Sequence, residues 1–206
     1  MWSPQDLIRL HDAVPATYEA KAAAWDRARS RALVERDWIA RTVAGLAPGA
    51  PVLDLGCGSG APISDHLIDR GFRVTGIDVA PAMLAMARAR HPGADWVLAD
   101  MRHAPLPGGQ GAIIGWDSVF HLTGAEQRAL LPRLVAALAP GGHLLVTVGA
   151  TESEAVGQVD GSPVYHASLS PETYERLCRD AGCEPASVTL RDAQVGRSVL
   201  LARRAG

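Results

Sequence analysis

A glycine-rich segment at residues 52–60 constrains the fold of this chain more than any other feature. A short apolar run that contains Asp54 leads there into three alternating glycines, Gly56, Gly58 and Gly60. Each glycine costs a strand or helix roughly 0.5–1 kcal/mol relative to alanine, so this density favours a turn that needs positive φ or has no room for a Cβ. An ordinary glycine turn is the alternative. The segment predicts a buried strand followed by a tight turn whose backbone comes close to a ligand.

The length and composition predict one globular domain over residues 1–206. The chain has 20 lysines and arginines, 22 aspartates and glutamates and a formal net charge of −2, so no basic excess points to nucleic acid or an anionic membrane. Its three cysteines form neither a disulfide framework nor a CxxC metal pair. No leader pattern is visible, and no apolar run approaches the roughly 20 residues of a membrane span. We expect a cytoplasmic protein, as a monomer or a homodimer.

From the glycine segment onwards, apolar strand patterns alternate with helical ones. Strands are expected at residues 51–55, 72–77, 94–99, 112–116 and 143–148, and helices at 61–70, 81–90 and 124–138. Strands separated by helices of roughly 10–15 residues are typical of parallel β-α-β units with right-handed crossovers. The pattern predicts the α/β fold class, with a doubly wound, Rossmann-like sheet that is mostly parallel.

The chain before the first strand is expected to be helical. A short helix is predicted at residues 4–14, ending before Pro15, and a longer helical segment at 18–46. Because these helices precede the first strand, they belong to no crossover. Residues 1–46 would form a helical cap on a Rossmann-like core at 50–206.

The chain after the fifth strand departs from the alternation. Residues 151–163 show no apolar period and predict a long loop. Ser170 then caps a helix that ends near Gly182. Residues 185–190 and 198–202 predict two closing strands, with an antiparallel strand near the C-terminus.

Acidic residues stand at the ends of four successive expected strands: Asp54, Asp78, Asp100 and Asp117. One such acid alone is more often a helix cap or a solvated loop residue. Open parallel sheets bind ligands at the carboxyl ends of their strands, so four acids are expected on one rim. Asp78 follows Gly56 by 22 residues, near the spacing at which a carboxylate binds a ribose diol. The glycine spacing is not Gly-x-Gly-x-x-Gly, which weakens the case for a dinucleotide.

Four motifs occur together in the chain: Asp54-x-Gly56-x-Gly58-x-Gly60 after a strand, Asp78 after the second strand, Ala99-Asp100-Met101 at the third, and Leu138-Ala139-Pro140-Gly141-Gly142 before the fifth. In combination they resemble the class I S-adenosylmethionine-dependent methyltransferases. Residues 116–122 and 164–169 are similar to a bacterial subgroup of small enzymes in that family. Tyr18-Glu19-x-x-Ala22-x-x-Trp25 is similar to the cap that closes over the cofactor in that subgroup.

The resemblance implies S-adenosylmethionine as the cofactor and a role for individual residues. The three glycines would pass beneath its methionine part, Asp78 would hold the ribose hydroxyls, and Asp100 would accept from the adenine amino group. The full set of implied cofactor-binding residues is Tyr18, Trp25, Asp54, Gly56, Cys57, Gly58, Gly60, Asp78, Val79, Met83, Asp100, Met101 and Trp116. For Tyr18 and Trp25, burial inside the cap is the alternative.

Methyl transfer from a sulfonium is an in-line displacement that a dry, well-oriented site accelerates, so a base is needed only when the acceptor arrives protonated. His121 and His166 are the candidate bases, because both are expected in loops near the rim and histidine titrates near neutrality. Tyr165 is a candidate hydrogen-bonding partner for the substrate. A structural role is the alternative for each. No metal site is predicted, because the remaining histidines have no partners at ligand spacing.

Together these features predict an enzyme that transfers a methyl group to a small-molecule acceptor, since the chain lacks a basic patch and has little room for a macromolecule-recognition domain. Three alternatives remain open. They are a nicotinamide-dependent oxidoreductase on a related sheet, a non-catalytic module that binds or senses S-adenosylmethionine, and a different chemical use of the bound sulfonium.

Overall fold

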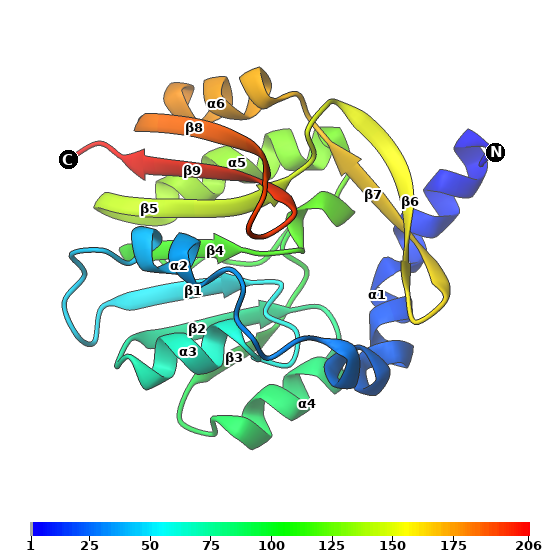
Figure 1. Cartoon of the computed structure of the whole chain (residues 1–206), viewed down its shortest axis with the longest axis horizontal. Helices are drawn as coiled ribbons and strands as arrows, with labels where there is room; N and C mark the ends of the chain where they lie inside the picture. The colour runs from blue at the N-terminus through cyan, green and yellow to red at the C-terminus, as the bar shows by residue number, and fades with distance from the viewer. Residues whose placement is uncertain (1) are drawn as a thin grey trace.

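The computed structural model describes residues 2–206, and a seven-stranded sheet forms its centre (Figure 1). The strands are β1 (Pro51–Leu55), β2 (Arg73–Asp78), β3 (Asp95–Leu98), β4 (Gln110–Gly115), β5 (Leu138–Val148), β8 (Cys183–Asp192) and β9 (Arg197–Arg204). Their order is β3-β2-β1-β4-β5-β9-β8. Neighbours from β3 to β5 pair in parallel, and β9 runs antiparallel to β5 and β8. The predicted fold class, a mostly parallel Rossmann-like sheet with an antiparallel strand near the C-terminus, is confirmed.

Helices cover both faces of this sheet. One face carries α2 (Arg36–Thr42), α3 (Ile63–Asp69) and α4 (Pro81–Arg90), and the other carries α5 (Gly124–Ala137) and α6 (Pro171–Asp180) (Figure 1). Val52 and Leu67 belong to the core on the first face, and Leu53 and Leu134 belong to the core on the second. Because both faces are buried, the central strands are near-continuous apolar runs. Leu53 is fully buried, so truncating it to alanine is expected to cost about 2–5 kcal/mol of stability.

Several predicted elements match the structure closely. β1 and α4 have the predicted bounds at both ends. Ser170 caps α6 as expected, because its Oγ accepts a hydrogen bond from the Thr173 amide at 3.2 Å. Both of the predicted closing strands are present as β8 and β9.

The first helix, α1 (Pro4–Ala28), continues through Pro15, so its predicted end at residue 14 is wrong. Ser3 starts the helix through a capping box with Asp6. Pro15 removes one backbone hydrogen bond from the helix. Beside it, however, Val14 is buried against Tyr165 of the strand β7 (Ser162–Ser168). Tertiary packing therefore outweighs the local preference of proline to end a helix.

The predicted helical segment 18–46 is interrupted between α1 and α2, which is a second correction. Leu33 lies in this break at a φ of 45° and is buried in the same core as Trp38 and Ile39 of α2. Positive φ is uncommon for a leucine and is incompatible with a continuing helix. The break turns the chain so that α2 packs on a face of the sheet, and apolar periodicity alone does not reveal it.

Residues 151–163, predicted to be a loop, contain the strand β6 (Ser153–Val159), which pairs with β7 as a hairpin. Asp160 and Gly161 form the turn, with φ values of 45° and 75°. Positive φ at both positions matches a type I′ turn, for which Asp-Gly is a favoured pair. This pair was the available sequence signal for the hairpin.

The strand β5 begins at Leu138 rather than at the predicted residue 143. The segment Pro140-Gly141-Gly142, expected between the helix and the strand, lies inside β5, where the pairing with β4 shifts register. A Cβ at Gly142 would stand 2.8 Å from the carbonyl oxygen of Gln110. Glycine is needed there because the two backbones approach so closely.

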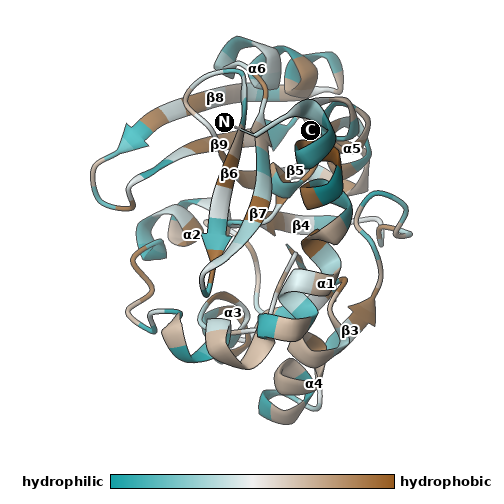
Figure 2. Ribbon diagram, turned by 90° about the vertical axis from the view of Figure 1, so that its right-hand side faces the viewer, coloured by the Kyte–Doolittle hydropathy of each residue, from teal (hydrophilic) through white to brown (hydrophobic). Residues whose placement is uncertain are grey.

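α1 and the β6–β7 hairpin, which we call the cap, lie over the carboxyl ends of the parallel strands (Figures 1 and 2). The hairpin therefore joins the predicted N-terminal cap, whereas α2 lies on the core. α1 contacts β7, β6 and α4. Within residues 2–206, no helix combines the length and the apolar character needed to cross a bilayer.

Candidate active site

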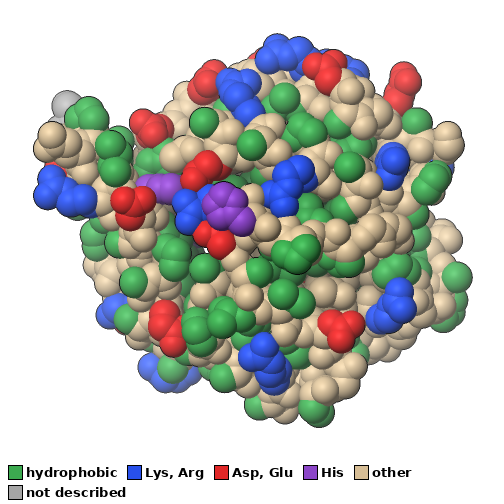
Figure 3. Space-filling view, turned by 180° about the vertical axis from the view of Figure 1, so that it is seen from behind, with side chains coloured by type: hydrophobic (Ala, Val, Ile, Leu, Met, Phe, Trp, Pro, Cys, Tyr) green, Lys and Arg blue, Asp and Glu red, His purple; other side chains and the backbone are tan. Residues whose placement is uncertain are grey.

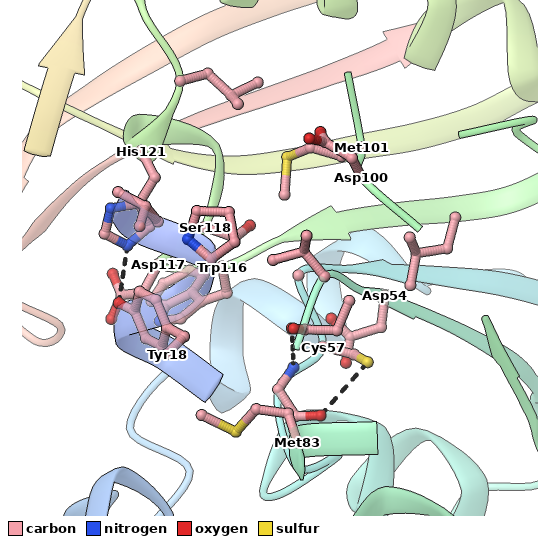
Figure 4. A pocket seen from close by; sticks show the side chains of 18 of the residues that line it. Tyr18, Asp54, Cys57, Met83, Asp100, Met101, Trp116, Asp117, Ser118 and His121 are labelled. Carbon is pink, nitrogen blue, oxygen red and sulfur yellow. Dashed lines mark hydrogen bonds between the residues drawn. The ribbon is translucent and has the colours of Figure 1, made fainter. Parts of the chain in front are cut away.

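A cavity of about 1040 Å³, mouth included, lies between the cap and the carboxyl edge of the sheet (Figure 4). The segments after β1, β2, β3 and β4 reach it from the sheet, and α1 reaches it from the cap. The predicted site residues that line it are Tyr18, Trp25, Asp54, Gly56, Cys57, Gly58, Asp78, Val79, Met83, Asp100, Met101, Trp116 and His121. The structure thus brings most of the predicted residues to one cavity.

The glycine turn, residues 56–60, follows β1 at the centre of this edge. The amides of Gly56 and Cys57 both donate to the carbonyl oxygen of Ile77, at 2.8 and 3.1 Å, which fixes the turn against β2. Gly56 has a φ of 73°, and a Cβ there would stand 2.3 Å from the Cβ of Ser118. Gly58, at a φ of 54°, lies under the ring of Trp25. The turn therefore requires glycine for its backbone conformation and, at Gly56, for space.

Asp78 ends β2 and supports the glycine turn. Its Oδ2 accepts from the Gly58 amide at 2.8 Å, and its Oδ1 accepts from the Ala80 amide at 2.9 Å. Burial raises the pKa of Asp78, against the opposing effect of these two hydrogen bonds. Each carboxylate oxygen keeps lone-pair capacity beyond its one amide donor. Asp78 can therefore accept further hydrogen bonds from a diol in the cavity.

Asp54 is the most deeply buried acid of the cavity, with 3% of its surface exposed. The hydroxyl of Ser64 donates to its Oδ2 at 2.6 Å. Burial raises the pKa of Asp54 to about 7. Near neutral pH this carboxyl is therefore only partly ionised.

A chain of charged side chains joins the end of β3 to the cap. Arg102 donates from Nε to both oxygens of Asp100, at 3.0 and 2.9 Å, and from Nη1 to Glu126 at 3.0 Å. The other oxygen of Glu126 lies 2.9 Å from Nε2 of His11 in α1. Acidic, basic and histidine side chains gather on the face seen in Figure 3. Burial favours a raised pKa for Asp100, but the hydrogen bonds from Arg102 outweigh it and lower that pKa.

Tyr18 of α1 and His121, at the end of the short 3-10 helix Val119–His121, form a hydrogen-bonded pair in the cavity wall (Figure 4). Nδ1 of His121 lies 2.9 Å from the carbonyl oxygen of Tyr165, which can only accept, so this nitrogen carries the proton. Nε2 is then the acceptor, and the hydroxyl of Tyr18 donates to it at 2.8 Å. Burial lowers the pKa of His121 to about 4 and raises that of Tyr18. Both side chains are neutral at pH 7.

Three predicted site residues do not line the cavity. Gly60 is the last residue of the turn, and a Cβ there would stand 3.1 Å from the ring of Trp96 instead of facing the cavity. The hydroxyl of Tyr165 donates to Glu154 instead of reaching the cavity, although its carbonyl orients His121. The ring of His166 packs edge-on against that of His121, with 4.9 Å between ring centroids. Within residues 2–206, no group of three or more potential ligand side chains is arranged to hold a metal ion.

Ser118 and Arg29 are among the cavity residues that were not predicted as site residues. The hydroxyl of Ser118 donates to the Leu55 carbonyl at 2.6 Å and so ties the end of β4 to the glycine turn. Arg29 directly follows α1 and pairs with the fully buried Glu35. The sequence did indicate a site near Ser118, since this residue adjoins an acid at a predicted strand end. No such indication exists for Arg29, because its position depends on where α1 ends.

Comparison with known proteins identifies related sequences. The methyltransferase domain family matches residues 52–142. The chain is 32% identical to a malonyl-[acyl-carrier protein] O-methyltransferase from Serratia marcescens over 186 residues, covering 86% of this chain and 70% of that protein. It is 43% identical to a trans-aconitate 2-methyltransferase from Paracidovorax citrulli (strain AAC00-1) over 104 residues, 49% of this chain. That match spans 39% of the length of the trans-aconitate enzyme.

Solved structures of methyltransferases share the fold. An amino pentose methyltransferase from Micromonospora echinaspora with bound S-adenosylmethionine has a TM-score of 0.69 at 26% identity, covering 90% of this chain and 96% of that one. A magnesium protoporphyrin IX methyltransferase from Synechocystis PCC 6803 with bound S-adenosylhomocysteine has a TM-score of 0.71 at 17% identity, covering 95% and 99%. None of these relatives supports the nicotinamide-dependent or non-catalytic alternatives. Sequence identity over most of a methyltransferase's length, together with this fold, shows that the chain belongs to the class I S-adenosylmethionine-dependent methyltransferases.

Proposed function

We propose that this protein transfers the methyl group of S-adenosylmethionine to a small-molecule acceptor in the cavity under the cap. The observation that carries the proposal is the Asp78 carboxylate, which lines the cavity and supports the glycine turn beside it. The Asp78 carboxylate can accept hydrogen bonds from a ribose diol, and the glycines of the turn beside it have no side chains to obstruct a ligand. This combination suits a nucleoside joined to an aminoacyl chain. The family membership of the chain supports the same cofactor.

The remaining cavity residues fit the other parts of this cofactor. The glycine turn leaves room for the methionine part, and Arg29 offers a guanidinium to its carboxylate. Asp100 and Met101 follow β3, the strand next to the one that ends in Asp78, and would hold adenine. The cofactor would thus extend along the edge of the sheet, from β3 past β2 to β1.

When bound, S-adenosylmethionine supplies an electrophilic methyl group on a positively charged sulfur. The protein's contribution is to exclude water and to orient the acceptor. Water stabilises the charged reactants more than the charge-dispersed transition state, so α1 over the cavity favours reaction. Holding the nucleophile in line, at about 3–3.5 Å from the methyl carbon, contributes several kcal/mol.

Calorimetry with S-adenosylmethionine and S-adenosylhomocysteine tests the proposed cofactor. We expect one site per chain for each compound, and no heat from NADH. Asp78→Ala should weaken binding by about 1.5–3 kcal/mol, the scale of hydrogen bonds to a charged group. Asp95→Ala is the matched control, because Asp95 is an exposed acid at the opposite end of the neighbouring strand β3. Absence of binding at millimolar concentration would rule the proposal out.

A further inference from the structure

The order of the strands locates the reacting end of the site, on the assumption that the proposed function is correct. With adenine at β3, ribose at β2 and methionine at β1, the next strand along the edge is β4. The cavity residues that follow β4 include Trp116, Asp117, Ser118 and His121, and Tyr18 faces them from α1. This group of five residues, the β4 end of the cavity, is where an acceptor would meet the methyl group.

The hydrogen-bond directions at the β4 end leave one free acceptor in the Tyr18–His121 pair. The proton of the Tyr18 hydroxyl is directed to Nε2 of His121, because the other ring nitrogen donates to the backbone. The lone pairs of the Tyr18 oxygen remain. Tyr18 lines the cavity, so its oxygen can accept a hydrogen bond from a group bound there.

The positive charges of the cavity are already paired. Among the described residues that line it, those able to carry positive charge are His11, Arg29, Arg102 and His121. His11 and Arg102 contact Glu126. Arg29 contacts Glu35 and is also the residue proposed to bind the carboxylate of the cofactor, so it is not free for an acceptor. Burial keeps His121 neutral by lowering its pKa to about 4. Apart from the sulfonium of the bound cofactor, a carboxylate acceptor would therefore meet no unpaired cation at the β4 end, and no protein charge there would offset its desolvation.

The negative charges are accounted for in the same way. Asp117 at the β4 end pairs with Arg197, whose Nε lies 2.9 Å from its Oδ1. Asp54, Asp78 and Asp100 stand at β1, β2 and β3, where they would face the cofactor. An ammonium group would therefore also find no free counter-charge among the described residues of the β4 end.

We propose that the acceptor is a neutral hydroxyl group, and that Tyr18 and His121 form a relay that takes its proton. In this step, a lone pair of the hydroxyl oxygen forms the bond to the methyl carbon. The carbon–sulfur bond breaks and its electron pair stays on sulfur, which becomes neutral. The acceptor's proton passes to Oη of Tyr18 while the Tyr18 proton passes to Nε2 of His121. The products are a methyl ether, S-adenosylhomocysteine and an imidazolium, which returns its proton to solvent.

A weak base such as the Tyr18–His121 relay is sufficient for a hydroxyl acceptor. An alcohol oxygen that has gained a methyl group becomes strongly acidic before it loses its proton, so a weak base suffices to take it. A carboxylate has no proton to lose. A protonated amine must lose a proton before it can attack, and it is too weak an acid for a base whose pKa is about 4. The groups that face His121 are Tyr18 from α1, His166 and the Tyr165 carbonyl from β7, and Asp117 after β4.

The chemical class of the product tests the acceptor directly. The protein would be incubated with S-adenosylmethionine carrying a ¹³C-methyl group and a small-molecule extract of bacterial cells, and in parallel with trans-aconitate. We expect label with the ¹³C shift of an oxygen-bound methyl group that resists alkali, as an ether does. Label released as methanol by alkali, methylated trans-aconitate, or an N-methyl product would overturn the hydroxyl assignment. Any of these would leave the proposed function standing, whereas lack of cofactor binding would remove both.

Variants test the relay. Tyr18→Phe and His121→Asn should each lower kcat at least tenfold, while the Kd for S-adenosylhomocysteine changes less than threefold. The matched control is His91→Asn, because His91 contacts Asp65 outside the cavity. In the unaltered protein, kcat should fall as pH drops below about 5, as His121 takes up a proton, and ¹⁵N NMR should show Nε2 unprotonated at pH 7. Full activity in Tyr18→Phe, which keeps the ring and its packing, would exclude the relay.

Discussion

At the scale of single residues, the contact between the glycine turn and Ser118 determines how closely β1 and β4 can approach at the cavity. Gly56→Ala would place a Cβ 2.3 Å from the Cβ of Ser118, on a backbone at positive φ. We expect a loss of several kcal/mol of stability, or of binding to S-adenosylhomocysteine, because both strain and overlap arise. Chemical denaturation and calorimetry measure the two losses.

The substitution Gly71→Ala separates the cost of backbone strain at positive φ from the cost of steric overlap by the new Cβ. Gly71 has a φ of 82°, but nothing lies within 4 Å of the position a Cβ would take. Its replacement should cost only the strain, about 1 kcal/mol, and leave ligand affinity unchanged. Equal losses at the two positions would show that the space beside Ser118 is unimportant.

Asp54 makes stability depend on pH in a direction that can be worked out. Its folded pKa, about 7, is above its ordinary value of 3.8, so the folded state holds the proton more tightly. The resulting stabilisation is complete below about pH 4 and is lost as pH rises to about 7. Asp54→Asn removes the ionisation, so it should be more stable than the unaltered protein at pH 8, by about 1–3 kcal/mol.

Urea denaturation at pH 4.5 and pH 8 measures this effect. The gain from Asp54→Asn should be smaller at the lower pH, where the aspartate is protonated as well. Asp95→Asn, at an exposed site, should leave the pH dependence unchanged. A gain that is the same at both pH values would contradict the assignment to Asp54.

At the scale of elements, Asp26 holds the end of α1 to the core. Its carboxylate accepts hydrogen bonds from Ser59 of the glycine turn, from Arg31 at 3.0 Å and from Arg90 of α4 at 2.7 Å. Only 13% of the Asp26 side chain is exposed. Asp26→Asn should therefore weaken the attachment of α1 by about 1–3 kcal/mol.

Hydrogen exchange resolves that loosening along the chain. Amides near the end of α1 should exchange roughly ten to a hundred times faster in Asp26→Asn, while those of β1 and β4 change little. Asp37→Asn, in the exposed first turn of α2, is the control. If α1 exchanged no faster than in the control, Asp26 would not be its attachment to the core.

The elements that the sequence revealed are those whose periodicity and caps agree with their tertiary surroundings. β1, α4 and α6 are of this kind, because their apolar faces and boundary residues point to the same ends. Pro15 predicts a helix end at residue 14, but the packing of Val14 on β7 keeps α1 continuous. The break at Leu33 was hidden because a buried leucine at positive φ carries no local signal. The only local signal for the hairpin is its Asp-Gly turn, because residues 151–163 show no apolar period.

The site residues that could be predicted from the sequence are those at the ends of the strands. Asp54, Asp78 and Asp100 reach one cavity because the carboxyl ends of parallel strands meet on one edge. The arginines of the cavity were not predictable. Arg102, which binds Asp100, is placed by a loop, and Arg29, which binds Glu35, is placed by the end of a helix. The sequence indicates His121 as a candidate base, but the hydrogen bond between His121 and Tyr18 joins segments far apart in sequence. Such a contact exists only once the cap has folded over the sheet.

At the scale of the whole molecule, the sheet and the cap contribute different halves of one site. The sheet supplies acids and the glycine turn in the order β3, β2, β1, which suits an extended cofactor. The cap supplies Tyr18 and Trp25 from α1, and the hairpin orients His121 through the Tyr165 carbonyl. Because the acceptor end lies between the two, its chemistry depends on how they pack together.

A crystal structure of the protein with S-adenosylhomocysteine tests this account most directly. We predict adenine at Asp100 and Met101, the ribose diol on the Asp78 carboxylate, and the methionine part along the glycine turn. The sulfur should face the β4 end, so that a methyl group on it would point towards Tyr18 and His121. A ligand bound outside this cavity, or one whose sulfur faces away from β4, would contradict the account.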